Sequence, residues 1–256
     1  MNYLEKILET KQIEIGELDT LQNYKKEFQS YPRLDIRTIN WSANLDVISE
    51  IKRKSPSKGE LSEIKNPVEL ATKYQAGGSC LISVLTDKQY FGAEKDDLLR
   101  IRENVETPVL RKDFIISDRQ VYESYFMGAD AILLIVAAFK NKEDLSYLFE
   151  LAISIGLGVL VEAHDKDEYE IALEIGASII GVNTRDLTTF EENAQAAIDI
   201  FKNKSQHVVN VWESGIRDLE DAHRAYESGA DALLIGQGLV QSKDPTQFLR
   251  DIRHIG

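Results

Sequence analysis

Residues 128–135 read Gly-Ala-Asp-Ala-Ile-Leu-Leu-Ile, a turn followed by an apolar run. Glycine suits the left-handed position just past the end of a helix, and a short apolar run is typical of a buried strand. The same change from glycine to strand recurs at residues 77–79, 176–178 and 229–231, with 51, 48 and 53 residues between successive copies. Each interval is long enough for two strands and two helices, so the chain contains four related double units.

The whole chain alternates between short β-branched runs and longer helix-like segments. We expect strands at residues 45–51, 79–85, 108–112, 131–136, 158–163, 178–183, 207–212 and 231–236, and helices at 67–76, 95–104, 118–127, 142–155, 165–175, 193–203, 218–228 and 245–255. Such alternation is typical of a parallel sheet covered by helices. An open doubly wound sheet would show two halves, whereas four double units favour closure. The sequence therefore predicts an α/β protein whose residues 1–256 form a single (β/α)8 TIM-barrel domain.

Residues 1–44 precede the first predicted strand and are expected to form a helical extension that packs on the barrel. Tyr3, Leu4, Ile7 and Leu8 fall on one face of a single predicted helix, and residues 29–40 read as a polar connector. An apolar helix face needs a partner, so we expect this helix to fold over the barrel mouth.

Composition narrows the class of protein. The 43% hydrophobic and 29% charged residues are ordinary for a soluble globular chain, and no apolar run is long enough to span a bilayer. A single cysteine, Cys80, excludes an internal disulfide framework and fits a reducing cytoplasm. The net charge of −13 argues against nucleic acid as a partner. We expect a cytoplasmic monomer or weak homo-oligomer that binds no membrane.

A basic stretch interrupts this acidic background. Residues 46–60 read DVISEIKRKSPSKGE, with four Lys or Arg and no acid between Ile51 and Lys58. Glu50 and Lys52 are two apart, so on a strand they point to the same side. Taken alone, the stretch is also explained by a solvated edge strand with a basic loop. Beside the polar strand ends described next, it favours a cavity that receives an anionic small molecule.

Polar residues follow the ends of five predicted strands, where the active sites of such barrels lie. Alternation along a strand places Leu110 with Lys112, and Leu160 with Glu162, on a common inward face. Solvent exposure explains a polar residue at one strand end, but not polar residues at the ends of five strands. We therefore expect an active site there, at Glu50 and Lys52, Lys112 and Asp113, Glu162, Asn183 and Arg185, and Glu213 and Ser214, with His164 as a neighbouring loop residue.

The last two predicted strands end in residues 213–216, ESGI, and 236–239, GQGL. Glycines let backbone N–H groups approach an anion, and the loops after the last two strands are the usual phosphate site of the fold. We predict a phosphate site there, with Ser55 as a further donor. The four histidines are scattered without ligand spacing, and no nucleotide-binding glycine loop follows a strand, so we expect no metal and no cofactor.

Eight blocks of the chain are EIKRKSPS, ISVLTDKQYFG, PVLRKDFI, GADAILLI, LVEAH, IGVNTRDL, ESGI and ALLIG. In this order they resemble the block pattern of the indole-3-glycerol phosphate synthase family, from about Trp41 to Gly238. The resemblance implies a metal-free and cofactor-free carboxy-lyase of tryptophan biosynthesis. Such an enzyme cyclises 1-(2-carboxyphenylamino)-1-deoxyribulose 5-phosphate to indole-3-glycerol phosphate and releases CO2 and water.

The resemblance also implies roles for single residues. It makes Lys112 the acid at the substrate ketone, for which we expect burial and Lys52 to lower the Lys112 pKa toward neutrality. The division of tasks between the two lysines, and between Glu50 and Glu162, stays open. The implied residues are Glu50, Lys52, Lys112, Glu162 and Asn183 for catalysis, Phe114, Leu134, Arg185 and Ser214 for substrate contact, and Ser55, Gly215, Gly236 and Gln237 for phosphate.

Three residues depart from the family pattern. Thr184 stands where Asn or Ser is usual, Trp212 stands where a smaller residue often precedes ESG, and Gln237 replaces the commoner side chain of the last block. The first is a mild change beside the amide of Asn183, and the second alters the pocket wall. The third leaves the Gly236 backbone, rather than the side chain of residue 237, as the expected phosphate donor.

Two other functions stay open. An isomerase barrel such as phosphoribosylanthranilate isomerase would need a Cys/Asp pair at the strand ends, but Cys80 begins its strand and should lie at the opposite end of the barrel. A catalytically inactive barrel that serves as an interaction partner is the other alternative. Two lysines that face two glutamates argue against it, because a solvent-filled mouth has no use for them.

Overall fold

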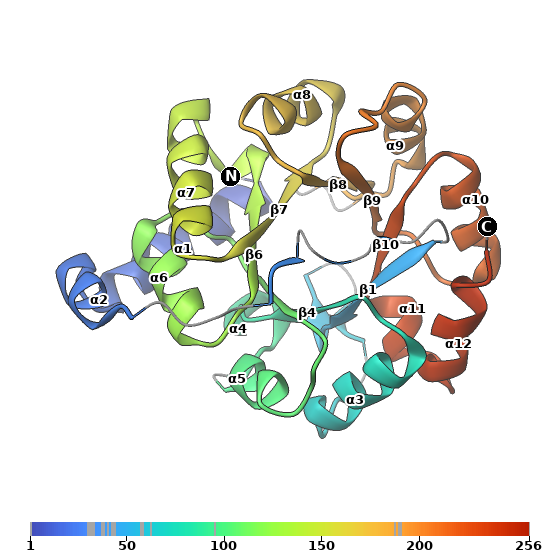
Figure 1. Cartoon of the computed structure of the whole chain (residues 1–256), viewed down its shortest axis with the longest axis horizontal. Coiled ribbons are helices and arrows are strands. Elements are labelled where there is room, and N and C mark those ends of the chain that lie inside the picture. The colour runs from blue at the N-terminus through green and yellow to red at the C-terminus, as the bar shows by residue number, and fades with distance from the viewer. Residues whose placement is uncertain are drawn as a thin grey trace.

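The computed structural model describes residues 2–29, 34–36, 39, 41, 45–56, 59–61, 63–94, 96–186, 188 and 191–255. In this part of the chain, eight parallel strands close into a barrel in the order β1-β10-β9-β8-β7-β6-β5-β4 (Figure 1). They are β1 (Asp46–Ile51), β4 (Leu81–Leu85), β5 (Val109–Lys112), β6 (Ala131–Ile135), β7 (Gly158–Ala163), β8 (Ile179–Asn183), β9 (Val209–Glu213) and β10 (Ala232–Ile235). The predicted TIM barrel is confirmed, and every predicted strand lies within two residues of its observed bounds.

Helices occupy the connections and cover the outside of the barrel (Figure 1). They are α3 (Pro67–Gly77), α4 (Lys88–Phe91), α5 (Asp97–Arg102), α6 (Asp118–Phe126), α7 (Lys142–Ser154), α8 (Lys166–Glu174), α9 (Ala194–Phe201), α10 (Leu219–Glu227), α11 (Gln237–Val240) and α12 (Pro245–Ile252), with a 3-10 turn, η2 (Val136–Ala138). Most of the α-helices begin after an Asn, Asp or Ser whose side chain accepts the first free N–H groups, as Asn66 does for Val68, whereas α5 and α11 begin without such a bond.

Four short elements escaped prediction: α4, α11, η2 and the hairpin of β2 (Lys54–Ser55) with β3 (Gly59–Glu60). Each follows the end of a barrel strand and lies at the mouth. Elements of two to four residues are too short for hydrophobic periodicity to reveal them.

The repeated glycines explain why each double unit ends where it does. Gly78 and Gly128 have φ of 89°, Gly176 has 85° and Gly229 has 104°. Residues with a Cβ rarely adopt this left-handed backbone conformation, which glycine adopts without a steric clash. The four glycines end the helices before β4, β6, β8 and β10, as the repeat predicted.

Two helices, rather than the single predicted one, begin the chain: α1 (Tyr3–Glu17) and α2 (Leu21–Glu27). The side chain of Thr20 accepts a hydrogen bond from the N–H of Asn23 and starts a new helix there. Tyr24 on α2 stacks on Tyr122 and Phe126 of α6. The break lets α1 and α2 pack on different parts of the barrel.

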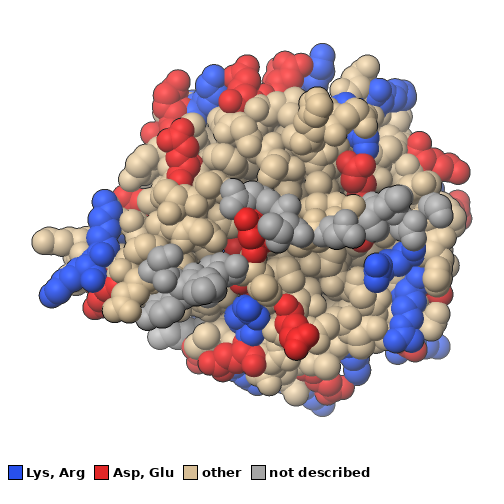
Figure 2. Space-filling model, in the orientation of Figure 1, with Lys and Arg blue, Asp and Glu red and all other residues tan. Residues whose placement is uncertain are grey.

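Residues 34–36 cover the opposite, N-terminal end of the barrel and cross its opening in Figure 1. Ile36 is fully buried against Gly158 at the start of β7, and the N–H of Leu34 donates to Asp130. On the face that Figure 2 shows, basic side chains are interspersed with acidic ones. This distribution differs from the one-sided basic stripe of nucleic-acid-binding domains.

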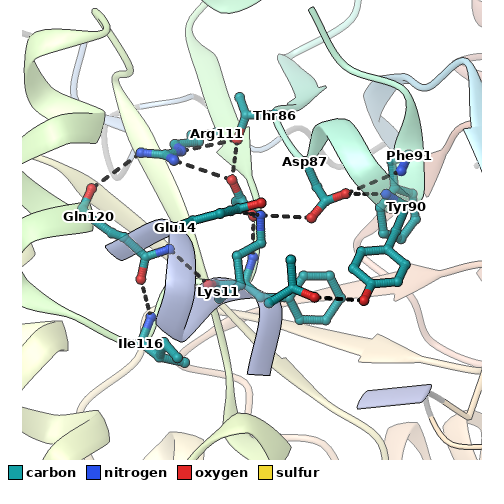
Figure 3. A network of polar contacts seen from close by, with 12 residues as sticks. Lys11, Glu14, Thr86, Asp87, Tyr90, Phe91, Arg111, Ile116 and Gln120 are labelled. Atoms are coloured by element: carbon teal, nitrogen blue, oxygen red, sulfur yellow. Dashed lines mark hydrogen bonds and ion pairs between the residues drawn. The ribbon is translucent and has the colours of Figure 1, made fainter. Parts of the chain in front are cut away.

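Lys11 anchors α1 to the barrel mouth (Figure 3). Its Nζ lies 2.7 Å from Asp87 Oδ2, 2.9 Å from Asp113 Oδ1 and 2.8 Å from Glu14 Oε2, and its side chain is only 2% exposed. Asp113 directly follows β5, and the Asp87 side chain caps α4 through the N–H of Tyr90. One buried ammonium therefore holds α1 against two neighbouring strand ends.

Replacing Lys11 by methionine is expected to lower the free energy of unfolding by about 3–5 kcal/mol, because the buried Asp87 loses the ammonium that pairs with it and the buried Asp113 keeps only Arg111. Equilibrium denaturation measures the change. Lys6→Met, at an exposed position of the same helix, is the matched control and should shift it by less than about 0.5 kcal/mol. Equal effects of the two changes would show that the buried contacts do not stabilise α1.

Candidate active site

One cavity opens in the barrel mouth, at the C-terminal ends of the strands. Twelve of the thirteen predicted site residues border it. They are Glu50, Lys52, Ser55, Lys112, Phe114, Glu162, Asn183, Arg185, Ser214, Gly215, Gly236 and Gln237.

Leu134 is the exception. It is fully buried in the apolar layer between the sheet and the helices, whereas its neighbours Leu133 and Ile135 face the barrel interior and border the cavity. Side chains alternate along a strand, so a displacement of one residue moves a side chain to the other face. The prediction that Leu134 contacts a substrate is therefore wrong.

Lys112, the last residue of β5, lies between two buried carboxylates. Its Nζ is 3.1 Å from Glu162 Oε2 at the end of β7 and 2.9 Å from Glu213 Oε2 at the end of β9. Both glutamate side chains are at most 2% exposed. Residues 50 and 101 positions apart in sequence thus meet at one ammonium group.

The expected lowering of the Lys112 pKa is wrong. Burial does lower the pKa of this ammonium, but the carboxylates of Glu162, Glu213 and Glu50 outweigh burial and raise the pKa above its ordinary value. The expectation counted Lys52 as the nearest charge. Lys52 is instead paired with Glu50, and three acids face Lys112. Lys112 therefore stays an ammonium through neutral pH.

Glu213 was expected at the active site from its place at a strand end, but no role was predicted for it. Burial raises the pKa of its carboxyl, Lys112 lowers it and Glu162 raises it again, with a net rise. The opposite holds for Glu162, whose pKa falls because burial is outweighed by Lys112, His164 and Asn183. The inward alternation of Val211 with Glu213 was the signal that would have identified it.

Gly181 on β8 makes room for the Glu213 carboxylate. A Cβ at this position would overlap Glu213 Oε1 and lie 2.9 Å from its Cδ. The absence of a side chain here lets the carboxylate of β9 reach across β8 toward Lys112.

Asn183 and Ser214 orient the carboxylate of Glu162. The Asn183 Nδ2 donates to Glu162 Oε1 over 3.1 Å, and the Asn183 Oδ1 accepts from Ser214 Oγ over 2.8 Å. The N–H of Arg185 also donates to Asn183 Oδ1, and the Arg185 guanidinium binds Glu192. Both the nitrogen and the oxygen of the Asn183 side-chain amide are thus held by hydrogen bonds.

His164 contacts Glu162 from outside the cavity. Its Nε2 lies 3.3 Å from Glu162 Oε1 and its Nδ1 lies 3.0 Å from Glu168 Oε2. Burial lowers the pKa of this imidazole, but the two carboxylates outweigh burial and raise the pKa to about 10. The loop histidine of the prediction is therefore an ion-pair partner of a residue that borders the cavity.

Only part of the basic stretch faces the cavity. Lys52 borders it, beside Glu50. Arg53 instead binds Asp97, and Lys54 Nζ donates to the carbonyl of Gln89 over 2.6 Å. Lys58 lies outside the described residues. Among the described residues of this stretch, the positive charge that borders the cavity is thus that of Lys52.

An aromatic wall closes another side of the cavity. The rings of Phe91 on α4 and Phe114 after β5 lie 6.2 Å apart, and both border the cavity with Leu133 and Ile135. Phe91 belongs to the unpredicted helix α4, so its place could not be inferred from periodicity. An apolar ring of a ligand fits against this wall.

Among the described residues, no three His, Cys, Asp or Glu side chains are grouped as metal ligands would be. None of the helices in the described ranges is long and apolar enough to cross a membrane.

Comparison with known proteins identifies the family. A sequence model described as indole-3-glycerol phosphate synthase matches residues 4–252. The chain belongs to the indole-3-glycerol phosphate synthase family. An indole-3-glycerol phosphate synthase of Chloroherpeton thalassium is 45% identical over 95% of this chain and 96% of its own, and that of Chlorobaculum tepidum is 40% identical over 97% and 99%. The family predicted from the eight blocks is therefore confirmed.

Solved structures with low identity share the barrel alone. The 3-hexulose-6-phosphate synthase of Salmonella typhimurium superposes with a TM-score of 0.65 at 14% identity, over 82% of this chain and 98% of its own. Thiamine phosphate pyrophosphorylase of Pyrococcus furiosus gives 0.61 at 16% identity, over 82% and 95%.

The pairing of His164 predicts a pH dependence of stability. Because the folded pKa of about 10 exceeds the ordinary 6.5, this imidazolium stabilises the fold fully below about pH 6.5, and its contribution is lost as pH rises toward 10. His164→Gln should therefore flatten the decline of the unfolding free energy between these pH values. His223→Gln, on the outer helix α10, is the control, and an unchanged slope in His164→Gln would contradict the assignment.

Proposed function

We propose that this chain is an indole-3-glycerol phosphate synthase that converts 1-(2-carboxyphenylamino)-1-deoxyribulose 5-phosphate to indole-3-glycerol phosphate, CO2 and water. The observation that carries the proposal is the buried Lys112 between Glu162 and Glu213, in the mouth of a barrel of this family. The single cysteine is compatible with work in the reducing cytoplasm.

Ring closure needs a donor at the ketone. An aromatic carbon attacks the ketone carbon, a C–C bond forms, and negative charge develops on the ketone oxygen. The Lys112 ammonium stabilises this charge as a hydrogen-bond donor in a site that excludes water. Its raised pKa makes it a poor source of the proton, so Glu213, whose pKa is also raised, is the group that carries a proton to the oxygen.

Decarboxylation and dehydration use the remaining groups. Lys52 holds the substrate carboxylate until CO2 leaves with its bond to the ring broken and the electron pair returned to the ring. Glu50, which Lys52 and Lys112 keep ionised despite burial, holds Lys52 in place. Glu162 is ionised and accepts the proton that the ring carbon loses, and the departing hydroxyl takes a proton from Glu213, once this carboxyl has been reprotonated, so that it leaves as water.

The two ends of the substrate have matching surfaces. The aryl ring packs against Phe91 and Phe114, which border the cavity with their rings in contact. The phosphate lies at the loops after β9 and β10, where Gly215 and Gly236 bring backbone close to the cavity and Ser55 adds a hydroxyl. Arg185 and Ser214 contact the ribulose chain.

The position of Cys80 does not support the isomerase alternative. Its thiol precedes β4, at the N-terminal end of the barrel, and donates to the carbonyl of Val47. Burial raises the pKa of this thiol. A Cys/Asp pair at the mouth is therefore not available from this residue.

The proposal is tested by following indole fluorescence with the carboxyphenylamino-deoxyribulose phosphate as substrate, in EDTA. Lys112→Ala should lower turnover by about 10²–10⁴, because the oxygen loses its charged donor. Lys65→Ala is the control, since the Lys65 side chain is 79% exposed, and it should turn over like the wild type. A folded wild type without turnover would refute the function, and near-normal turnover of folded Lys112→Ala would refute the role of the lysine.

A further inference from the structure

Ser214 has an unusual backbone conformation. It is the residue other than glycine with positive φ, 70°, in the described part of the chain, and Gly215 follows it with φ of 78°. The backbone of a residue other than glycine is strained in this left-handed region, and such strain persists only where neighbouring groups hold the backbone in place. The residues that hold it are therefore of interest.

Trp212, one of the departures from the family pattern, holds the carbonyl of Ser214. Its indole Nε1 donates to this oxygen over 3.0 Å. The ring is 3% exposed in the layer between sheet and helices, with its centroid 5.9 Å from that of Phe201 on α9. A smaller apolar residue would fill space here but would not donate this bond.

Because the peptide is planar, the bond to the Ser214 carbonyl also fixes the direction of the N–H on the other side of the same peptide. The carbonyl of Ser214 and the N–H of Gly215 belong to one trans peptide and point in opposite directions. Since the carbonyl points to an indole on the helix side of the sheet, the N–H points away from the helices. Gly215 borders the cavity, and its N–H donates to no other group among the described residues.

Thr184, a second departure, holds the preceding peptide. Its N–H and its Oγ1 both donate to the carbonyl of Glu213, over 3.0 and 3.1 Å. Thr184 is 4% exposed. The two peptides that flank Ser214 are thus each fixed through their carbonyl oxygen, one by the residue that follows β8 and one by an indole in the layer between sheet and helices.

We propose that Trp212, with Thr184, is a positioning residue for anion binding: it holds the strained Ser214 backbone so that the Gly215 N–H faces the phosphate of the substrate. The proposal rests on the proposed function for the identity of that substrate. The shared chemistry is a phosphate group, so inorganic phosphate is a probe that does not require turnover.

The test compares Trp212→Phe, which keeps a buried ring but loses the N–H donor, with the wild type. Calorimetric titration with inorganic phosphate should give a Kd that is ~3–10-fold higher in the variant, the effect of one hydrogen bond. KM for the substrate should rise by a similar factor while kcat stays within about twofold, because the phosphate is bound alike in ground and transition states.

Phe201→Leu is the matched control, because it disturbs the same packing without touching the Ser214 carbonyl. It should lower stability but leave the phosphate Kd and KM unchanged. Thr184→Val, compared with Thr184→Ser, provides a second test in case Trp212→Phe does not fold: Val should weaken phosphate binding and Ser should retain it.

The outcomes separate the two proposals. Phosphate binding that is equal in Trp212→Phe and wild type, or absent from the wild type, would overturn the positioning role. A wild type that binds phosphate more tightly than Trp212→Phe but makes no indole product would support the positioning role and refute the proposed function.

Discussion

The burial of Lys112 between two carboxylates is the constraint on which the barrel mouth depends. Charges of this kind are costly in an apolar interior unless partners satisfy them. Below this level the barrel is filled by Leu110, Leu133 and Leu160. The charged groups are therefore confined to the strand ends, where they satisfy one another and still meet the cavity. Within this cluster, burial and Glu162 outweigh Lys112 and raise the pKa of the Glu213 carboxyl, whereas the pKa of Glu162 is lowered.

The same mouth tolerates backbone strain. A left-handed Ser214 costs about 1–3 kcal/mol relative to an unstrained residue. The bonds from Trp212 and Thr184 to neighbouring carbonyls offset this cost, at about 1 kcal/mol each. The strained backbone of Ser214 sets the direction of the Gly215 N–H. An unstrained turn would not point this N–H at the cavity.

The N-terminal extension contributes to the mouth through a single ammonium. Lys11 contacts Asp113, the residue directly after Lys112, and Asp87, which caps the helix that carries Phe91. Arg111 and Thr86 bind the other oxygen of Asp113. Burial disfavours the charge of Asp113, yet Lys11 and Arg111 lower its pKa to about 2. The helix is thus fixed beside both the charged cluster and the aromatic wall. Its apolar face led us to expect a helix over the barrel mouth, but not the ammonium that holds it there.

The sequence by itself determined the barrel and most of its mouth. Spacing of glycines predicted four double units because glycine favours the left-handed conformation that commonly follows a helix, and alternation predicted which strand residues point inward. Only the tertiary structure decided the pKa values in the site, which face of β6 points inward, and where the short elements at the barrel mouth lie. The pKa of Lys112 depends on which acids closure brings to it, so the expected lowering became a rise. The prediction that Leu134 faces the cavity was off by one residue. A two-residue period does not identify which residues of an all-apolar strand such as β6 point inward. The roles of Trp212 and Thr184 arise from contacts across strands, which periodicity along one strand does not encode.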